Sequence, residues 1–231
     1  MVNEFIEGII EAFTLLLTFD PEVWGIIGLS IRVSGTAIFF AILISLPVGT
    51  YLALREFHGK KTLTNIINTF MGFPPVVMGL FVFLLLSKSG PLGSLGLLYS
   101  PTAMITAQLL LAIPIIIGTS KAAVENVDPV LQETILSLGA NERQLWWELI
   151  KESKKSIIAG VIVAFGQAIS EVGAVMIVGG NIRWHTRTFT TSIVLQTRMG
   201  EFGMAIALGL ILIILSFILN YTLTHLQMKE K

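Results

Sequence analysis

Five polar side chains stand inside long apolar stretches of this sequence: Arg32, Gln108, Gln167, Ser170 and Glu171. Arg32 and Glu171 are ionisable, and an ionisable group surrounded by hydrocarbon is costly unless it finds a partner. Amides and hydroxyls at such positions either join neighbouring helices by hydrogen bonds or line a path for a polar solute. These residue types therefore suggest the holding or passing of an ion, and both interpretations of the neutral side chains stay open.

Arg32 and Glu171 are expected at the same depth. Arg32 lies eight residues beyond Trp24, and Glu171 lies eight residues before Gly179. At about 1.5 Å per residue, each is roughly 12 Å from the end of its helix. We therefore predict that the two side chains pair. In the competing interpretation, Arg32 faces a pathway and its charge attracts an anion.

Other kinds of chemistry find no support in the sequence. It has no Gly-x-x-x-x-Gly-Lys-Ser/Thr loop, so the chain cannot itself hydrolyse ATP. No His or carboxylate cluster has metal-ligand spacing, and no nucleophile stands beside a base. Cysteine is absent and the net charge is zero. We expect no catalytic residue, no metal, no cofactor and no nucleic-acid partner.

The elements that must position the polar residues are membrane helices. Of 231 residues, 54% are hydrophobic and 13% charged, against about 25% charged in an ordinary soluble domain. Because backbone polar groups find no water inside a bilayer, apolar runs of roughly 20 residues must be helical there. We predict an all-α membrane protein, a single transmembrane domain over residues 1–231, with five transmembrane helices at residues 24–54, 62–87, 99–120, 157–179 and 203–226.

Prolines interrupt three of these runs, at Pro47, at Pro74-Pro75 and at Pro114. Prolines in spanning helices usually mark kinks whose freed carbonyls are satisfied by neighbouring groups. Simple packing kinks and hinges that move during transport are both open at these positions.

The basic residues divide unequally between the two sides that five crossings create. One side collects Arg55, Lys60, Lys61, Lys121, Arg143, Lys151, Lys154, Lys155, Lys229 and Lys231, and the other collects Lys88, Arg183, Arg187 and Arg198. The positive-inside rule places the first group in the cytoplasm. We therefore expect a multi-pass protein of the cytoplasmic membrane with its N-terminus outside and its C-terminus inside.

Residues 1–20 predict an interfacial amphipathic helix. Glu4, Glu7 and Glu11 fall on one helical face and apolar residues cover the rest. The segment is too short and too acidic to span a bilayer, and Pro21 separates it from the first long run. It has neither a basic leading region nor a small-residue cleavage site, which argues against a cleaved signal peptide.

The polar segment of residues 127–156 is much longer than the roughly 2–8 residues of a typical helix connection. Asp128-Pro129 predicts the start of a helix and Gly139 predicts its end. A second amphipathic helix is expected over residues 141–152. This segment is either a docking element for a soluble partner or an ordinary hairpin at the membrane surface.

The run from Glu133 to Ile150 resembles the cytoplasmic loop of ABC-importer permeases, in which a Gly follows a Glu by six residues. Glu133, Leu138, Gly139 and Ala140 match that pattern, whereas Thr134-Ile135 replaces two alanines and Lys151-Glu152 replaces a Leu-Pro pair. The resemblance implies a type I importer fold. It also implies that a helix carrying Glu133, Leu136, Leu138, Gly139 and Ala140 docks into an ATP-hydrolysing subunit.

Two further stretches, residues 71–93 and 168–191, resemble the permeases of tungstate importers, with molybdate and sulfate permeases as relatives. The resemblance implies the import of an oxyanion, and the stretches are most similar to those of tungstate importers. The implied partners are a second copy of the chain, two ABC ATPases that carry the ATP and Mg²⁺, an extracytoplasmic binding protein and membrane lipid.

The outer loop of residues 180–202 is basic for its side, with Arg183, His185, Arg187 and Arg198. Arg183 and Arg187 are candidates for contact with acidic residues of the binding protein, or for drawing an anion toward the pore. A solvated loop is the alternative. For the whole chain, the alternatives to the permease are an ATP-independent secondary transporter and a non-transporting membrane scaffold.

Overall fold

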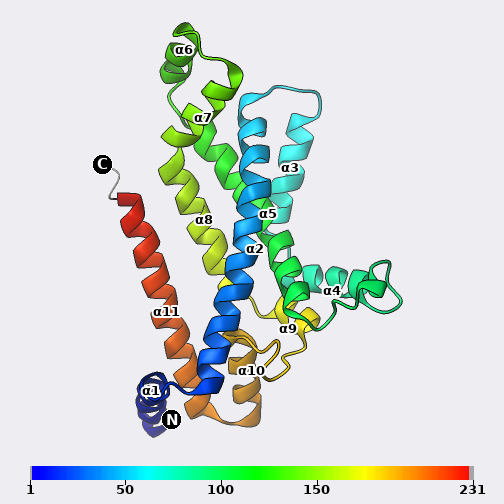
Figure 1. Ribbon diagram of the computed structural model, residues 1–231, viewed down its shortest axis with the longest axis vertical. Coiled ribbons are helices and arrows are strands. Elements are labelled where there is room, and N and C mark those ends of the chain that lie inside the picture. Colours follow the sequence, from blue (N-terminus) through cyan, green and yellow to red (C-terminus); the bar gives the residue numbers. More distant parts are fainter. Residues whose placement is uncertain (1, 229–231) are drawn as a thin grey trace.

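Helices form the regular structure of this chain (Figure 1). The computed structural model describes the backbone of residues 2–228 and the side chains of residues 6, 8–221 and 225. Within that part there is no strand, and the elements are α1 Val2–Leu17, α2 Pro21–Leu54, α3 Lys60–Met71, α4 Pro75–Leu86, the 3₁₀ helix η1 Gly93–Leu95, α5 Pro101–Glu125, α6 Pro129–Ser137, α7 Glu142–Glu152, α8 Lys154–Ile169, α9 Gly173–Gly179, α10 Phe189–Met199 and α11 Phe202–Met228. The side chains of Glu4 and Glu7 and the residues Lys229 and Lys231, on which sequence predictions rest, lie outside the described part.

The central pair of the bundle is α2 and α5, which pack against each other along much of their lengths (Figure 1). Small residues at the contact let the two backbones approach closely. A Cβ atom added at Gly49 would lie 2.9 Å from the carbonyl oxygen of Ile117. Pro47 and Pro114 lie inside α2 and α5 without ending either helix. Neither proline therefore marks a break in this structure.

Two of the five predicted runs are bent instead of straight. The helices α3 and α4 meet at 99°, and α8 and α9 meet at 54°. Three helices of the described chain are long and apolar enough to cross a membrane, and the number is five when each bent pair counts as one span. The prediction of five crossings is confirmed in that sense, and the all-α fold is confirmed.

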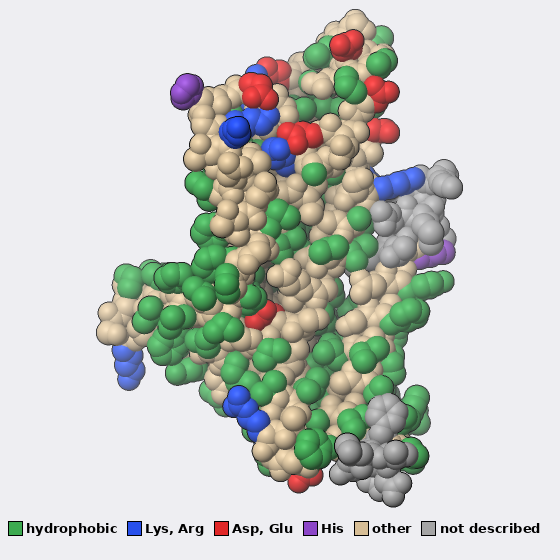
Figure 2. Space-filling view, turned by 180° about the vertical axis from the view of Figure 1, so that it is seen from behind, with side chains coloured by type: hydrophobic (Ala, Val, Ile, Leu, Met, Phe, Trp, Pro, Cys, Tyr) green, Lys and Arg blue, Asp and Glu red, His purple; other side chains and the backbone are tan. Residues whose placement is uncertain are grey.

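The bend between α3 and α4 is larger than the predicted kink. Pro74 has extended backbone, with φ −61° and ψ 120°, and Pro75 takes the first position of α4. A proline disfavours helical backbone at the residue before it, so two in succession end one helix and start another. As a result α4 runs sideways from the bundle as an arm (Figure 1), and hydrophobic side chains cover this arm on the face shown in Figure 2.

The end of the molecule that carries α1 also holds α10 and the start of α11 (Figure 1). Here α1 packs across α11, with Ala12 buried and Gly8 so close that an added Cβ atom would lie 2.7 Å from Ile206 Cγ2. The helix α10 corrects the expectation of a loop over residues 180–202. Its signals are a capping box between Thr188 and Thr191 and the left-handed Gly200, at φ 80°, that ends it.

Candidate functional site

The helix α6 forms at the end of the molecule opposite α1 (Figure 1), as its flanking residues predict. The carboxylate of Asp128 accepts a hydrogen bond from the amide of Val130 at 2.9 Å, which caps the first turn. Gly139 has a φ of 84°, in the left-handed region that glycine adopts without strain. Its amide donates to the carbonyl of Leu136 at 3.0 Å. The predicted start and end of this helix are confirmed.

The helix α7 anchors α6 to the bundle. The side chain of Asn141 and that of Gln144 cap each other's backbone amides at 2.9 and 2.8 Å. Leu145 and Leu149 are buried in a cluster with Val124 of α5, and Ile135 of α6 packs against the same cluster. Because one apolar cluster joins α5, α6 and α7, a force on α6 is transmitted to the bundle.

The structure explains how the chain turns without the Leu-Pro pair of the family pattern. Ser153 is both the last capping residue of α7 and the residue that precedes α8. Its hydroxyl donates to the carbonyl of Leu149 at 2.6 Å. The helix α8 therefore begins at Lys154 directly after α7. A further tie is the ion pair between Arg55, at the end of α2, and Glu142 of α7.

An exposed surface on α6 combines one acidic and three apolar side chains. We name Val130, Glu133, Leu136 and Leu138 the docking surface. Val130, Leu136 and Leu138 are 65%, 47% and 82% exposed, and Glu133 is also exposed. Figure 2 shows charged side chains near this end of the molecule on the face in view. Apolar side chains gathered in a charged setting indicate a contact surface for another protein. Gly139 and Ala140 lie beside this surface, so the structure brings all five predicted docking residues together.

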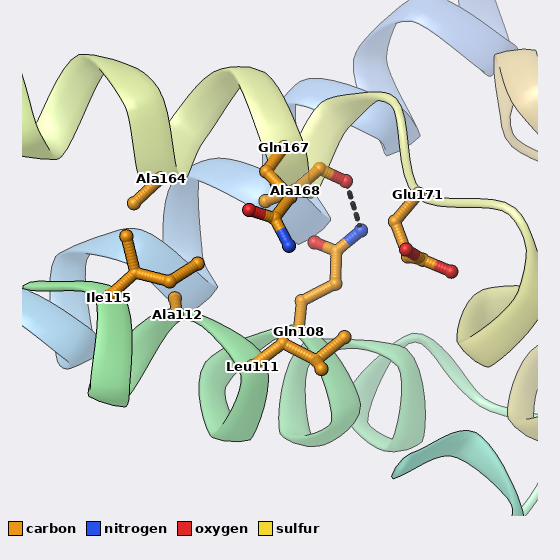
Figure 3. Close-up of a pocket in the computed structure, with 8 residues that line it drawn as sticks. All are labelled: Gln108, Leu111, Ala112, Ile115, Ala164, Gln167, Ala168 and Glu171. Carbon is orange, nitrogen blue, oxygen red and sulfur yellow. Dashed lines mark hydrogen bonds between the residues drawn. The ribbon is translucent and has the colours of Figure 1, made fainter. Parts of the chain in front are cut away.

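Three of the five predicted intramembrane residues, Gln108, Gln167 and Glu171, line one cavity where α8 ends (Figure 3). Gln108 of α5 is buried, and its amide nitrogen donates to the carbonyl of Ala168 at 2.8 Å. Gln167 and Glu171 line a cavity with Gln108, and its volume of about 10 Å³ is close to the space that one water molecule needs. Ser170 ends α8. Within this polar cluster, Gln108 and Glu171 satisfy backbone groups at the break.

The predicted pair between Arg32 and Glu171 is wrong for this structure. No ion pair among the described residues joins them. Glu171 instead accepts a hydrogen bond from the amide of Ala174 at 3.0 Å and caps α9. Arg32 has an exposed side chain on α2. The prediction rested on equal depth along the two helices. Because α8 ends just before Glu171, the carboxylate instead binds a backbone amide three residues further along the chain.

The predicted outer residues Arg183 and Arg187 both bind one carboxylate that sequence reasoning missed, that of Glu22 at the start of α2. Arg183 donates to Glu22 Oε2 from Nε at 3.1 Å and from Nη2 at 2.6 Å. Arg187 donates from Nη1 to Glu22 Oε1 at 2.9 Å. The hydrogen bond to Glu22 and the attraction of its charge raise the pKa of Arg183. More than 160 residues separate these partners, so no local pattern points to them.

Comparison with known proteins identifies the family of this chain. Residues 45–230 match the family described as binding-protein-dependent transport system inner membrane component. The chain belongs to this family of permeases. The permease is 43% identical to the tungstate uptake system permease protein TupB of Peptoclostridium acidaminophilum, over 96% of this chain and 97% of that protein. It is 39% identical to TupB of Campylobacter jejuni, over 95% and 91% of the two chains.

Solved structures show the same fold at low sequence identity. A permease chain in an inward-facing structure of the MetNI methionine ABC transporter is similar with a TM-score of 0.74. The likeness covers 90% of this chain and 97% of that one at 18% identity. The permease is therefore a multi-pass membrane transport component with the fold of ABC importer permeases.

One prediction concerns the hydrogen bond at the α8–α9 break of the permease. We expect Gln108→Leu to lower the free energy of unfolding by about 1–3 kcal/mol, because the buried carbonyl of Ala168 loses its side-chain donor. Thermal unfolding in detergent measures the change. Gln167→Leu is the matched control, since Gln167 lines the same cavity but has an exposed side chain. Equal losses in both variants would contradict the role of this hydrogen bond.

Proposed function

We propose that this permease is the membrane-spanning subunit of an ATP-driven importer for a tetrahedral oxyanion, with tungstate as the preferred cargo. The observation that carries the proposal is the docking surface on α6, which combines an acidic residue with exposed leucines and is fixed to the bundle through α7. The cargo follows from two relatives named tungstate uptake permeases at 43% and 39% identity.

In this proposal the docking surface binds a cleft of a cytoplasmic ABC ATPase. Two copies of the permease form the pathway, and each engages one ATPase that carries the ATP and Mg²⁺. Closure of the ATPases on ATP draws the two α6 helices together. The apolar cluster of Val124, Leu145 and Leu149 passes that movement to α5. The pathway between the two copies then opens toward the outside to receive the oxyanion, and ATP hydrolysis returns it to the inward-facing state.

The proposed orientation puts α6 in the cytoplasm and α1 outside. It follows from the positive-inside rule, because the sequence assigns ten basic residues to the cytoplasmic side and four to the other. In Figure 1 the two ends of the molecule carry α6 and α1, in keeping with an odd number of crossings. The extracytoplasmic binding protein would then meet the end with α10. Arg183, whose side chain is 60% exposed, is available there for an acidic partner.

The decisive experiment is oxyanion-stimulated ATP hydrolysis by the permease reconstituted with its ATPase and binding protein. We expect stimulation by tungstate at the lowest concentration, then by molybdate, and by sulfate only at the highest. A preference for sulfate would contradict the proposed cargo. Oxyanion uptake that proceeds without any ATPase would instead support the secondary transporter.

A further inference from the structure

A groove of about 640 Å³ lies between α2 and α7, the helix that anchors α6 to the bundle. Apolar side chains form most of its wall: Leu46, Pro47, Trp146, Trp147 and Ile150. The polar part of the wall comes from Arg143, Gln144 and Glu148. Pockets that hold an organic ligand usually measure about 300–1,000 Å³ and are mainly apolar with a few polar groups. The groove therefore has the size and lining of a site for an apolar chain with a polar end.

The position of the groove along α2 sets its depth in the membrane. Between Arg32 and Arg55 this helix has no charged residue over residues 33–54, a length of roughly 33 Å at about 1.5 Å per residue. The hydrocarbon core of a bilayer is about 30 Å thick. Pro47 lies eight residues before Arg55, or roughly 12 Å along the helix toward the membrane centre. The wall formed by Leu46 and Pro47 therefore lies at the depth of lipid tails.

The opposite wall of the groove reaches the level of the lipid head groups. Arg55, just after α2, forms an ion pair with Glu142 in the first turn of α7. This contact holds the next residue, Arg143, near the end of the membrane-spanning part of α2. Trp146 packs edge-on against Tyr51 of α2, with the ring centroids 6.1 Å apart. Trp and Tyr are enriched at the boundary between tails and head groups, because each ring is partly apolar and partly polar.

Arg143 is a cation that no carboxylate of the groove neutralises. Its side chain is exposed, and it forms no ion pair within the part of the chain that the structure describes. The carboxylate of Glu148, which also lines the groove, binds Lys151 at 2.7 Å, and that of Glu142 is held by the ion pair with Arg55. Glu152 lies nine residues after Arg143, about two and a half turns, and so on the opposite side of α7. The groove therefore has a surplus positive charge at its polar end.

An exposed tryptophan lies one helical turn from this cation. Trp147 is 60% exposed and follows Arg143 by four residues, so the two side chains share a face of α7. The amine of Lys151 lies 5.8 Å from the centroid of the Trp147 ring. A large ring exposed to water is unfavourable, whereas the boundary between tails and head groups accommodates both the ring and the cation.

Exposed apolar side chains of α2 continue from the groove toward the membrane centre. Leu43 and Phe39 lie four and eight residues before Pro47, and residues at this spacing follow one face of a helix. Both side chains are more than half exposed. An acyl chain that begins in the groove therefore has an apolar path along α2.

We propose that this groove binds an anionic phospholipid, with an acyl chain against Leu46, Pro47 and Ile150 and the head-group phosphate on Arg143. A guanidinium can donate two parallel hydrogen bonds to phosphate oxygens, which favours a phosphate that keeps its negative charge. The lipid contacts α7, the element between the docking surface and the bundle. The inference goes beyond the proposed cargo and depends on neither the ATPase nor the binding protein.

The test is quenching of tryptophan fluorescence by lipids that carry bromine on their acyl chains. The full-length permease is placed in phosphatidylcholine vesicles with increasing fractions of brominated phosphatidylglycerol, which is anionic, or of brominated phosphatidylcholine. Trp24→Phe and Trp184→Phe remove the other two tryptophans of the chain, so Trp146 and Trp147 give the signal. We expect phosphatidylglycerol to reach half of its full quenching at a fraction about fivefold lower, the ratio that one basic residue typically gives an anionic lipid.

Substitution of Arg143 separates its charge from the general charge of the chain. Arg143→Gln should bring the two lipids within about twofold of each other, whereas Arg143→Lys should keep most of the preference because the charge remains. Lys61→Gln is the matched control, since Lys61 is an exposed basic residue in the first turn of α3 that does not line the groove. We expect this control to keep the full preference for phosphatidylglycerol.

Equal loss of preference in Arg143→Gln and Lys61→Gln would reduce the effect to general Coulomb attraction and overturn the inference. Equal quenching of the unaltered groove by both lipids would overturn it as well. Absence of quenching would show that a second copy covers the groove, and loss of quenching on addition of the ATPase would show that the ATPase does; either result contradicts a lipid site.

A second measurement avoids the tryptophan replacements. The permease with its native tryptophans, with and without Arg143→Gln, is purified from a mixture of the same two lipids, and the phospholipids that remain bound are counted. We expect phosphatidylglycerol to be enriched on the unaltered chain and not on the variant. Equal lipid composition on both would overturn the inference, and oxyanion-stimulated ATP hydrolysis would still test the proposed function separately.

Discussion

We expect Glu133→Lys to reduce coupled ATP hydrolysis and oxyanion uptake by at least thirtyfold while the chain still inserts in the membrane. Glu133 is exposed in the middle of the docking surface, between Val130 and Leu136. Reversing a charge that an interface buries leaves the partner charge unpaired or opposed, which costs about 2–5 kcal/mol. Each 1.4 kcal/mol is about a factor of ten in the binding constant.

The experiment has two readouts. Recovery of the ATPase with affinity-purified permease measures assembly, and tungstate-stimulated ATP hydrolysis in vesicles measures coupling. Glu152→Lys is the control, because Glu152 is an exposed glutamate of the same polar segment at the end of α7, outside the docking surface. If both variants lose assembly to the same degree, the effect is the summed charge of the segment and not a contact of α6.

Gly139 offers a second check on the same surface. Its φ of 84° makes a side chain strained there, but asparagine tolerates this region better than other residues. Gly139→Asn should therefore keep more ATPase binding than Gly139→Val, because only the valine forces the end of α6 to move. This order separates the geometry of α6 from the charge of Glu133.

The features that sequence predicted well depend on neighbours in the chain. Asp128 and Gly139 bracket α6 because a cap and a left-handed turn act within a few residues. The five crossings follow from hydropathy in the same way. The break at Ser170–Glu171 contains no proline, and its stability comes from the Gln108 hydrogen bond and the Glu171 cap. These are partners that only the folded chain brings together.

The side-chain partners across the bundle were the least predictable part. Depth along a helix placed Arg32 and Glu171 at one level, but depth does not fix the direction in which a side chain points. Arg183 and Arg187 seemed equivalent in sequence, and both bind Glu22 of α2, but the Arg183 side chain is 60% exposed and the Arg187 side chain is 14% exposed. The distinction between an exposed charge and a shielded charge therefore comes only from the three-dimensional structure.

The second large effect is expected at Gly79, where the arm α4 packs against α9. A Cβ atom added at Gly79 would lie 2.6 Å from Ala174 Cα and 3.1 Å from the carbonyl oxygen of Ala174. Both obstacles are backbone atoms, so no rotation of a side chain relieves the clash. Overpacking of this kind costs about 1–3 kcal/mol. We expect Gly79→Ala to lower the unfolding temperature in detergent by roughly 2–10 °C.

Two other glycines make the prediction specific. At Gly118 the nearest obstacle is the sulfur of Met71 at 2.5 Å, a flexible side chain that can move aside, so Gly118→Ala should cost less. At Gly209 in α11 an added Cβ atom meets nothing within 4 Å. Gly209→Ala should leave stability unchanged or raise it by up to about 1 kcal/mol, because alanine favours a helix more than glycine. Equal effects at all three positions would show that helix propensity, and not contact with α9, sets the outcome.

The Gly79→Ala substitution should also affect transport. Its neighbour α9 is capped by Glu171 and begins at the α8–α9 break, where Gln108 binds the carbonyl of Ala168. Pushing α4 away from Ala174 displaces the first turn of α9 and, with it, the polar cluster. We therefore expect Gly79→Ala to reduce tungstate-stimulated ATP hydrolysis at temperatures where the variant is still folded, while assembly with the ATPase through α6 is unchanged. The opposite pattern, lost assembly with normal hydrolysis per complex, would mean that the α4–α9 contact stabilises the fold without shaping the pathway.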